Sequence, residues 1–413
     1  MPRCFAGIDW SEGLNDVAVV DDSGEIIASA RIPETPEGIT ECLRLLAKAN
    51  PSSRHRRRDV PIAIETGTGL LVDALVSRGQ TVYAINPAVV ARYRGRLHPT
   101  RQKSDRRDAA LLANILRTDL IHHRPLPVNT PAATAIAVLV REYQSAARAR
   151  QRHFNRLRSQ LREYFPAAIT AWQELPNGLL RPEARALLAI APTPALAARL
   201  SRTRVRTTLA EAGRTRLLDD QADRLFDHFR IRQLRTHPVV EETMGIRTLA
   251  QLDALNHADH TATELAEHAG TAFEAHPHSA IYRSFPGVGP LIALRLFAEL
   301  GDDNTRFATA RGLRAYAGAA PLTWASGSGS SVSYRRIANK YLMATGHVWA
   351  FTSLTKSPGC RDHYDRRRAA GDAHAAALRN LFGRLITCLH HCLNHNELYN
   401  EATAFATAVS EAA

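Results

Sequence analysis

Short apolar runs separated by turn signals open the chain. Those between residues 5 and 31 predict two or three β-strands, the last two joined at Asp22-Ser23-Gly24. Residues 35–49 instead repeat their apolar positions with helical period, with Thr35 placed as N-cap and Pro36 in the first turn. The first 50 residues therefore predict strands followed by a helix.

Strands and helices then alternate. Apolar runs at 60–65 and 81–86 predict two further strands, and helical patterns occupy 70–79 and the stretch that begins at Asp105. The order β-β-β-α-β-α-β-α predicts an α/β domain with a mixed sheet.

Strand signals stop near residue 130. Residues 133–165 have a long helical period with arginines between the apolar positions, and Pro166 ends it. Arg-rich helical pattern continues over 183–234, and further helices are expected between about 340 and 395. A break in composition at His276-Pro277-His278 divides this remainder. We expect four parts: an α/β domain at 1–130, an Arg-rich helical region at 131–275, a mainly helical domain at 276–395 and a tail at 396–413.

Composition narrows the class of protein. The chain has 413 residues, enough for two or three domains, and 45% hydrophobic residues exclude wholesale disorder. No apolar run approaches the roughly 18–20 residues that span a bilayer, so we expect a cytoplasmic protein without membrane contact. Five cysteines are too few for a disulfide framework.

The charge is strongly positive. Lys and Arg number 53 against 40 Asp and Glu, a net charge of +13, and only four of the basic residues are lysine. GC-rich coding explains part of this preference for arginine over lysine. Selection for phosphate contacts is the other explanation, because the arginine guanidinium donates bidentate hydrogen bonds to phosphate oxygens. The excess nominates nucleic acid as the partner.

Within this positively charged chain, four carboxylates are candidate metal ligands. Asp9 lies in an otherwise apolar strand, Glu65 ends the strand expected beside it, and Asp105 and Asp108 are spaced i, i+3 near a helix start. If they converge, their repulsion is relieved by Mg²⁺ or Mn²⁺, which takes hard oxygen ligands and steadies phosphoryl oxygens. In the structural alternative, Asp9 caps a turn, Glu65 pairs with an arginine, and the two helical aspartates favour the helix N-terminus.

Two sets of motifs carry a resemblance. The series GIDW at 7–10, IET at 64–66 and KSDRRDA at 103–109 is similar to the DEDD transposases of bacterial insertion sequences. The second set is similar to the C-terminal transposase domain of that family: PGVGP at 286–290, AGAAPLTWASG at 317–327 and SPGCRDHYDRRRAAG at 357–371. Pilin-gene inversion recombinases belong to the same group. The resemblance covers about 1–165 and 280–385.

The resemblance implies a fold of class α/β plus α. Its N-terminal domain would be ribonuclease-H-like, of the Holliday-junction-resolvase variety. A helical coiled-coil middle would follow, and then a mainly helical C-terminal transposase domain with a helix-hairpin-helix-like motif at Pro286-Gly287-Val288-Gly289. Exposed amides of that hairpin can take a phosphate, although a purely structural turn has the same pattern.

The resemblance also implies a mechanism. Asp9, Glu65, Asp105 and Asp108 match the metal-binding tetrad of the family, and Ser326 matches its nucleophilic serine. Ser328 is the alternative, because serines crowd this Gly/Ser-rich loop. Members of the family recombine donor and target double-stranded DNA, are guided by a structured non-coding bridge RNA, and assemble from homodimers to tetramers.

A serine hydroxyl between small residues suits attack on a phosphodiester, since a phosphoserine bond conserves the energy for rejoining. Cationic groups would absorb the charge that develops on phosphorus. The candidates for contact with nucleic acid are Arg92, Arg94, Arg96, Arg101, Lys103, Arg148, Arg152, Arg156, Gly287, Gly289, Arg335, Arg336 and Lys340.

The sequence thus predicts a transposase that forms a covalent phosphoserine intermediate with DNA. A metal-dependent Holliday-junction-type nuclease without serine covalency is one alternative. A catalytically decayed protein that binds RNA or DNA is the other.

Overall fold

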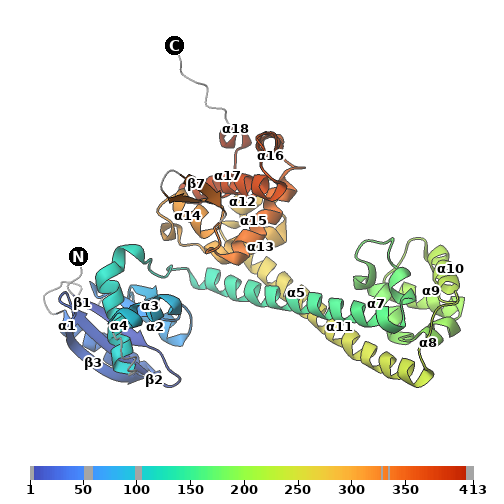
Figure 1. Ribbon diagram of the computed structural model, residues 1–413, viewed down its shortest axis with the longest axis horizontal. Helices are drawn as coiled ribbons and strands as arrows, with labels where there is room; N and C mark the ends of the chain where they lie inside the picture. The colour runs from blue at the N-terminus through green and yellow to red at the C-terminus, as the bar shows by residue number, and fades with distance from the viewer. Residues whose placement is uncertain (1–3, 51–58, 98–104, 327–328, 334, 406–413) are drawn as a thin grey trace, which may run out of the picture. The chain divides into compact units, whose positions relative to one another are not determined.

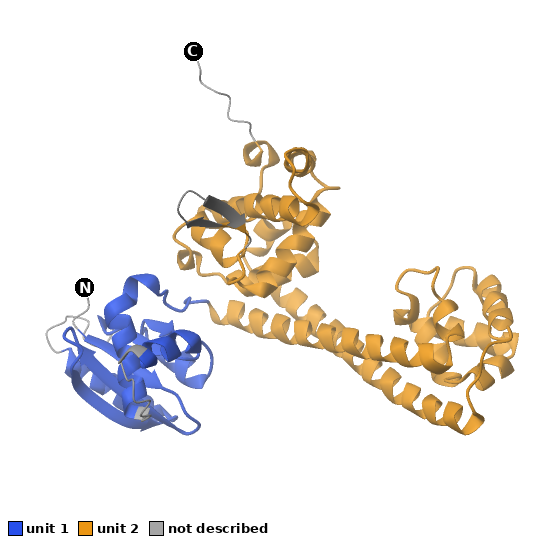
Figure 2. Ribbon diagram, viewed as in Figure 1, with its two compact units in different colours: residues 1–129 blue, residues 130–413 orange. Residues whose placement is uncertain are grey.

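The computed structural model describes residues 4–50, 59–97, 105–326, 329–333 and 335–405. The chain divides into two compact units, residues 1–129 and 130–413 (Figure 2). Each unit is described by itself.

A five-stranded sheet of order β3-β2-β1-β4-β5 forms the centre of the first unit (Figure 1). Strands β1 (Cys4–Asp9), β2 (Leu14–Asp21) and β3 (Ile26–Pro33) are antiparallel neighbours. Strands β4 (Ile62–Ile64) and β5 (Val82–Ala84) run parallel to β1. The predicted mixed sheet is confirmed, although β4 and β5 are shorter than their apolar runs.

Helices cover both faces of this sheet. Helix α1 (Pro36–Ala49), which Thr35 caps as predicted, and α2 (Leu70–Ser77) pack on the face that carries Ile8 and Ile62. Helices α3 (Pro87–Leu97) and α4 (Asp105–Asp119) pack on the face that carries Phe5 and Ala63. A short 3₁₀ turn, η2 (Leu120–His122), follows α4. Helix α3 is absent from the sequence-based prediction.

Two long antiparallel helices organise the second unit (Figure 1). Helix α5 (Pro131–Tyr164) begins at its N-cap Thr130 and ends before Pro166, and α11 (Pro238–Glu274) packs along it. Their contact is held by Arg150 and Asp259, 2.9 Å apart, and by Gln160, which donates to Thr248 at 2.9 Å. Each helix contributes to two hydrophobic cores, one at either end of the pair.

The first of these cores lies where α5 ends and α11 begins, and contains Leu157, Trp172 and Leu255. Short helices between the two long ones complete it: α6 (Ala167–Thr170), η3 (Gly178–Leu180), α7 (Pro182–Ile190), α8 (Pro194–Arg199), α9 (Arg202–Glu211) and α10 (Leu218–His228).

The second core lies where α5 begins and α11 ends, and contains Ile136, Phe273 and Trp349. Its further elements are α12 (Ser279–Arg283), α13 (Pro290–Leu300), η4 (Asn304–Arg306), α14 (Ala310–Tyr316), β6 (Leu322–Ser326), β7 (Gly329–Ser333), α15 (Lys340–Ser353), α16 (Pro358–Ala369), α17 (His374–His395) and α18 (Glu401–Ala404).

Two features of this part differ from the sequence-based expectation. The Gly/Ser-rich stretch, expected as a loop, forms the antiparallel hairpin β6–β7, because Thr323, Trp324 and Val332 favour a strand. The expected tail is packed as far as residue 405: the Tyr399 ring lies 4.5 Å from Phe285. Within the described residues, no helix has the length and apolar character that crossing a membrane requires.

Candidate active site

Helix α4 lies directly against strand β1, and Gly7 makes this possible. A Cβ atom at residue 7 would stand 2.0 Å from the Ala109 carbonyl oxygen and 2.6 Å from the Ala113 amide nitrogen. Any side chain at this position would therefore push the helix away from the sheet. The close approach sets the distance between the carboxylates that the two elements carry.

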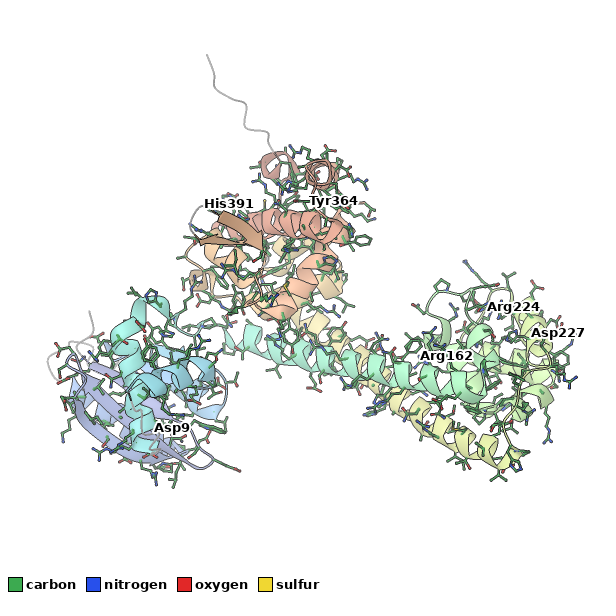
Figure 3. The ribbon with its side chains drawn as sticks, viewed as in Figure 1. Asp9, Arg162, Arg224, Asp227, Tyr364 and His391 are labelled. Carbon is green, nitrogen blue, oxygen red and sulfur yellow. The ribbon has the colours of Figure 1, made fainter. Side chains whose placement is uncertain are left out.

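Helix α4 runs in the direction that places its N-terminal turn, which contains Asp108, near the C-terminal end of β1. Phe5 packs in one cluster with Leu112 and Leu116, in the second half of the helix, whereas Gly7 faces Ala109. Alternation along a strand places Asp9 on the same face as Phe5 and Gly7, one step further toward the helix N-terminus. Asp9, labelled in Figure 3, ends β1, and its residue surface is half-buried.

Glu65 reaches the same edge from β4. Because β4 runs parallel to β1 with Ile64 opposite Ile8, residue 65 follows beside Asp9. Ala63, two residues earlier, packs in the cluster that includes α4. Within the described part of the chain the Glu65 carboxylate makes no hydrogen bond or ion pair, so the pairing with an arginine considered above is not observed there.

Asp108 is the buried member of the set, with 6% of its surface exposed. Its Oδ1 atom accepts from Arg94 of α3, at 3.1 Å from Nε and 3.0 Å from Nη2. Asp105 is the first residue of α4, and its side chain lies outside the described residues. We call Asp9, Glu65 and Asp108 the carboxylate edge.

Sequence reasoning missed one further acid at this edge. Asp16 of β2 is the direct partner of Asp9 in the antiparallel register, and such partners share a face of the sheet. Its Oδ2 atom accepts from Arg31 at 2.8 Å. The alternation of β2 could have revealed it, since Asp16 is two residues from Ala18, which contacts α4.

The three acids are carried by three elements that meet at one edge of the sheet, and carboxylate oxygens are the donors that a hard divalent cation takes. The described side chains alone do not form a group of three His, Cys, Asp or Glu residues that could hold a metal. The side chain of Asp105, the fourth candidate ligand, lies outside the described residues.

The candidate serine ends the first strand of a hairpin. Ser326 is the last residue of β6 and stands opposite Gly329 of β7. Ser328, the alternative nucleophile, and the side chain of Ser326 lie outside the described residues. We call β6 and β7 the serine hairpin.

The chain that leaves the serine hairpin is anchored through Asn339. The Asn339 side chain caps α15 and also donates to Glu299, 2.6 Å away, and to the Tyr316 hydroxyl at 2.7 Å. Glu299 is 2% exposed, and its Oε2 atom also accepts from Arg141 of α5 at 2.7 Å. This network ties the start of α15 to α13 and α5.

Tyr341 follows, between two arginines of α5. The guanidinium carbons of Arg141 and Arg148 lie 4.2 and 4.5 Å from its ring centre, and Arg148 donates to its hydroxyl at 3.0 Å. This hydrogen bond and the charge of Arg148 lower the pKa of Tyr341. Arg148, a predicted contact to nucleic acid, is therefore already engaged within the protein.

The PGVGP turn connects α12 to α13. Gly287 has φ of +73°, and a Cβ atom there would meet the Ser353 amide nitrogen at 2.5 Å. Gly289 has open space at the corresponding position. A structural reason thus accounts for Gly287, whereas Gly289 lines an open groove of about 770 Å³ with Val288, Phe351 and Lys356.

The remaining predicted contacts to nucleic acid differ in their surroundings. Arg92, Arg152, Arg156, Arg336 and Lys340 are exposed, and Arg335 is half-buried. Arg101, Lys103 and the side chain of Arg96 lie outside the described residues.

Comparison with known proteins identifies the class. Residues 6–166 match the DEDD model of the IS110 group, described as a transposase, and residues 279–365 match the transposase family IS116/IS110/IS902. The chain is thus an enzyme of the transposase class, which cleaves and rejoins DNA.

The similarity to individual relatives extends along the whole chain. A Streptomyces coelicolor protein named as a transposase for the IS117 mini-circle is 47% identical over 409 residues, covering 99% of this chain and 98% of the relative. The 43.6 kDa protein of insertion element IS110 from the same species is 30% identical, with 86% and 90% covered. The 44.8 kDa protein of IS116 from Streptomyces clavuligerus is 26% identical, with 97% of each covered. The chain belongs to the IS110 family of insertion-sequence transposases.

Proposed function

We propose that this transposase moves its element through a covalent phosphoserine intermediate, with Mg²⁺ or Mn²⁺ at the carboxylate edge and a bridge RNA as guide. The main supporting observation is the contact of α4 with Gly7. It brings α4, which carries Asp108 near its start, close to β1, and the pairing of β1 with β4 sets Glu65 beside Asp9. Family membership supports the same function.

Asp9, Glu65, Asp105 and Asp108 would hold the metal. When bound, it would steady the phosphoryl oxygens and assist deprotonation of the attacking hydroxyl. Ser326 Oγ attacks the phosphorus, an O–P bond forms, and the bond from phosphorus to one deoxyribose oxygen breaks. That oxygen takes up a proton, and the phosphoserine retains the energy of the broken bond. Attack by a hydroxyl of the strand to be joined reverses the step and releases Ser326.

Basic residues would hold the nucleic acids. Arg92, Arg96, Arg101 and Lys103 would contact the nucleic-acid backbone, and Arg152 and Arg156 would do so along α5. Arg335, Arg336 and Lys340 follow the serine hairpin and would stabilise charge on the reacting phosphate. The turn at Gly289 would act as a helix-hairpin-helix-like phosphate contact.

Assembly completes the proposal. The carboxylate edge and the serine hairpin belong to different units of the chain, and in the resembling family such sites are shared between protomers. The α5–α11 pair would serve as a coiled coil in a homodimer, and two dimers would hold donor and target DNA.

A trapped covalent adduct is the decisive measurement. Donor DNA is incubated with protein, Mg²⁺ and the RNA transcribed from the flanks of the element, and protein-linked DNA is counted after denaturation. Ser326→Ala should abolish the adduct, whereas Ser328→Ala should retain it. Asp105→Asn with Asp108→Asn should abolish it without loss of DNA binding.

Other outcomes decide against the proposal. Cleavage without an adduct would establish the junction-nuclease alternative, and an adduct that vanishes in Ser328→Ala would move the nucleophile. RNA binding with no strand transfer, unchanged by the Asp105 and Asp108 substitutions, would indicate a decayed copy.

A further inference from the structure

The groove beside the PGVGP turn contains an exposed aromatic ring. Phe351, near the end of α15, has 56% of its surface exposed. It lines the groove with Val288 of the turn, Ile292 of α13 and Leu354, and these three residues also pack against the second core. A volume of about 770 Å³ lies in the range of pockets that bind small organic ligands. The groove is thus an apolar site with an aromatic ring accessible from solvent.

The two walls of the groove are joined by hydrogen bonds. On the turn, the Pro286 carbonyl oxygen accepts from the Trp349 indole nitrogen at 3.1 Å, and the Gly287 carbonyl oxygen accepts from the Thr352 hydroxyl at 2.9 Å. Both donors belong to α15, the helix that carries Phe351. The turn and the ring therefore keep a set distance from each other.

The Phe351 ring has an aromatic neighbour that supports it. The His374 ring lies 6.4 Å away and nearly perpendicular, at 87°. The Nδ1 atom of His374 forms a hydrogen bond of 2.7 Å with the Tyr364 hydroxyl. A ring held in this way needs little ordering when a flat ligand stacks on it.

The charged residues that line the groove are cationic. Lys356 is exposed and has no partner among the described residues, whereas Arg361 lies 2.8 Å from Asp365. No acidic residue lines the groove within the described part of the chain. An apolar site with a free cation at its rim suits a ligand that combines a flat apolar face with negative charge, and a nucleotide has both.

The apolar walls distinguish between paired and unpaired nucleotides. In a duplex the faces of the bases are stacked on one another, so a duplex would offer these walls only phosphates and base edges. An unpaired base exposes its face, and bases of every sequence stack on aromatic side chains. Because the chain belongs to a class of enzymes that cleave and rejoin DNA, DNA is the favoured source.

We propose that this groove binds one unpaired nucleotide of a DNA strand, with the base stacked on Phe351 and a neighbouring phosphate at Lys356. The site would hold a strand whose pairing is interrupted while DNA is exchanged. This inference rests on the transposase class alone and requires neither the metal nor the serine of the proposed function.

The test uses the full chain without divalent cation and a DNA duplex that carries one unpaired 5-iododeoxyuridine. The fully paired duplex is the reference. Irradiation should cross-link the unpaired base to Phe351, identified by mass spectrometry of the peptide. Phe351→Ala should abolish this cross-link and weaken binding of the bulged duplex about fivefold or more, the usual effect of losing one base–aromatic stack, without weakening binding of the paired duplex.

Two variants sharpen the assignment. Val348→Ala is the matched control, since Val348 lies one turn earlier on α15, is 45% exposed and does not line the groove, and it should change neither measurement. Lys356→Gln should lower the slope of log affinity against log salt concentration by about 1 for the bulged duplex, the contribution of one phosphate contact.

Other outcomes overturn the proposal. Equal affinities of Phe351→Ala and wild type for the bulged duplex, or a cross-link elsewhere, would show that the base does not occupy the groove. A response with a bulged RNA duplex and none with DNA would make the source wrong. A change of oligomeric state in Phe351→Ala, without an effect on DNA binding, would identify the groove as a protein contact. If thermal unfolding shows that Phe351→Ala does not fold, Phe351→Leu decides, because leucine keeps the apolar bulk without an aromatic face.

Discussion

The carboxylate edge and the serine hairpin both place a candidate reactive group at the end of a strand, but the two strands are held very differently. Strand β1, which ends at Asp9, has β2 and β4 on either side and α4 pressed against Gly7. Strand β6, which ends at Ser326, pairs with β7 in a two-stranded sheet. Two-stranded hairpins are marginally stable on their own.

This difference teaches how each group acquires its geometry. The position of Asp9 is determined by the packing of β1 in the sheet and against α4. The serine hairpin is followed by a segment that is anchored through Asn339 and Glu299. If Ser326 is the nucleophile, as proposed above, its position depends on a two-stranded hairpin, whereas the proposed metal ligands depend on a five-stranded sheet.

The largest effect is expected from a substitution that disturbs the packing of α4 against β1. Gly7→Ala places a methyl group 2.0 Å from the Ala109 carbonyl oxygen, and α4 must shift to accommodate it. We expect the first unit to lose about 3 kcal/mol of stability, the upper end of the cost of overpacking, and transposition to cease. Thermal unfolding followed by circular dichroism measures the first effect, and excision of a marked element measures the second.

Gly95→Ala is the matched control in the same unit. Gly95 lies inside α3 with nothing within 4 Å of a Cβ atom. Alanine there should raise stability by about 0.5–1 kcal/mol, because glycine is unfavourable in a helix. If Gly7→Ala unfolds no earlier than wild type, α4 does not depend on that close approach.

The sequence predicted the carboxylate edge better than its surroundings. Asp9 and Glu65 could be placed together because each ends a buried apolar run and parallel strands bring such ends to one edge. Arg94 could not be assigned to Asp108, because its helix, PAVVARYRGRL, contains a glycine and interspersed arginines that obscure the period. The contact through Gly7 depends on tertiary packing, which no local pattern encodes.

For the serine hairpin, the sequence-based prediction failed at the secondary structure. Its glycines and serines suggested a loop, because these residues are depleted in strands or favour turns. The two segments nevertheless pair as strands, with Thr323 of β6 opposite Val332 of β7, and both residue types favour strands. The motif predicts Ser326 as a candidate nucleophile, which stays a prediction, whereas the strands around it were not predicted from the sequence.

A smaller effect tests the turn near the C-terminal candidate site. Gly287→Ala must tolerate a left-handed backbone and a contact of 2.5 Å with the Ser353 amide nitrogen, so we expect a loss of about 2 kcal/mol. Gly289→Ala has free space and should leave thermal unfolding unchanged. It should nevertheless weaken binding of duplex DNA about fivefold, the equivalent of one hydrogen bond, if a phosphate approaches this backbone. Unaltered DNA affinity in Gly289→Ala would establish the turn as purely structural.

The smallest effect concerns the arginines of α5, which are not equivalent although all lie on one helix. Arg152 and Arg156 are exposed and have no partner among the described residues, whereas Arg148 is bound to Tyr341. Replacing Arg152 and Arg156 together by Gln should lower the slope of log affinity against log salt concentration by about 2, since each phosphate contact contributes about 1. Arg148→Gln should change the slope by less, and it should return the pKa of Tyr341 toward its ordinary value, measured by absorbance against Tyr341→Phe.

A paired arginine from the helical region provides the reference for this measurement. Arg202 already lies 2.8 Å from Asp223, so Arg202→Gln removes a cation whose charge is locally balanced, and the slope should not change. Equal slopes for the Arg152 and Arg156 double variant and for wild type would mean that α5 does not carry the DNA or RNA backbone. The exposed arginines of α5 would then serve an interface between protomers, and the phosphate contacts would have to come from α3 and from the segment that follows the serine hairpin.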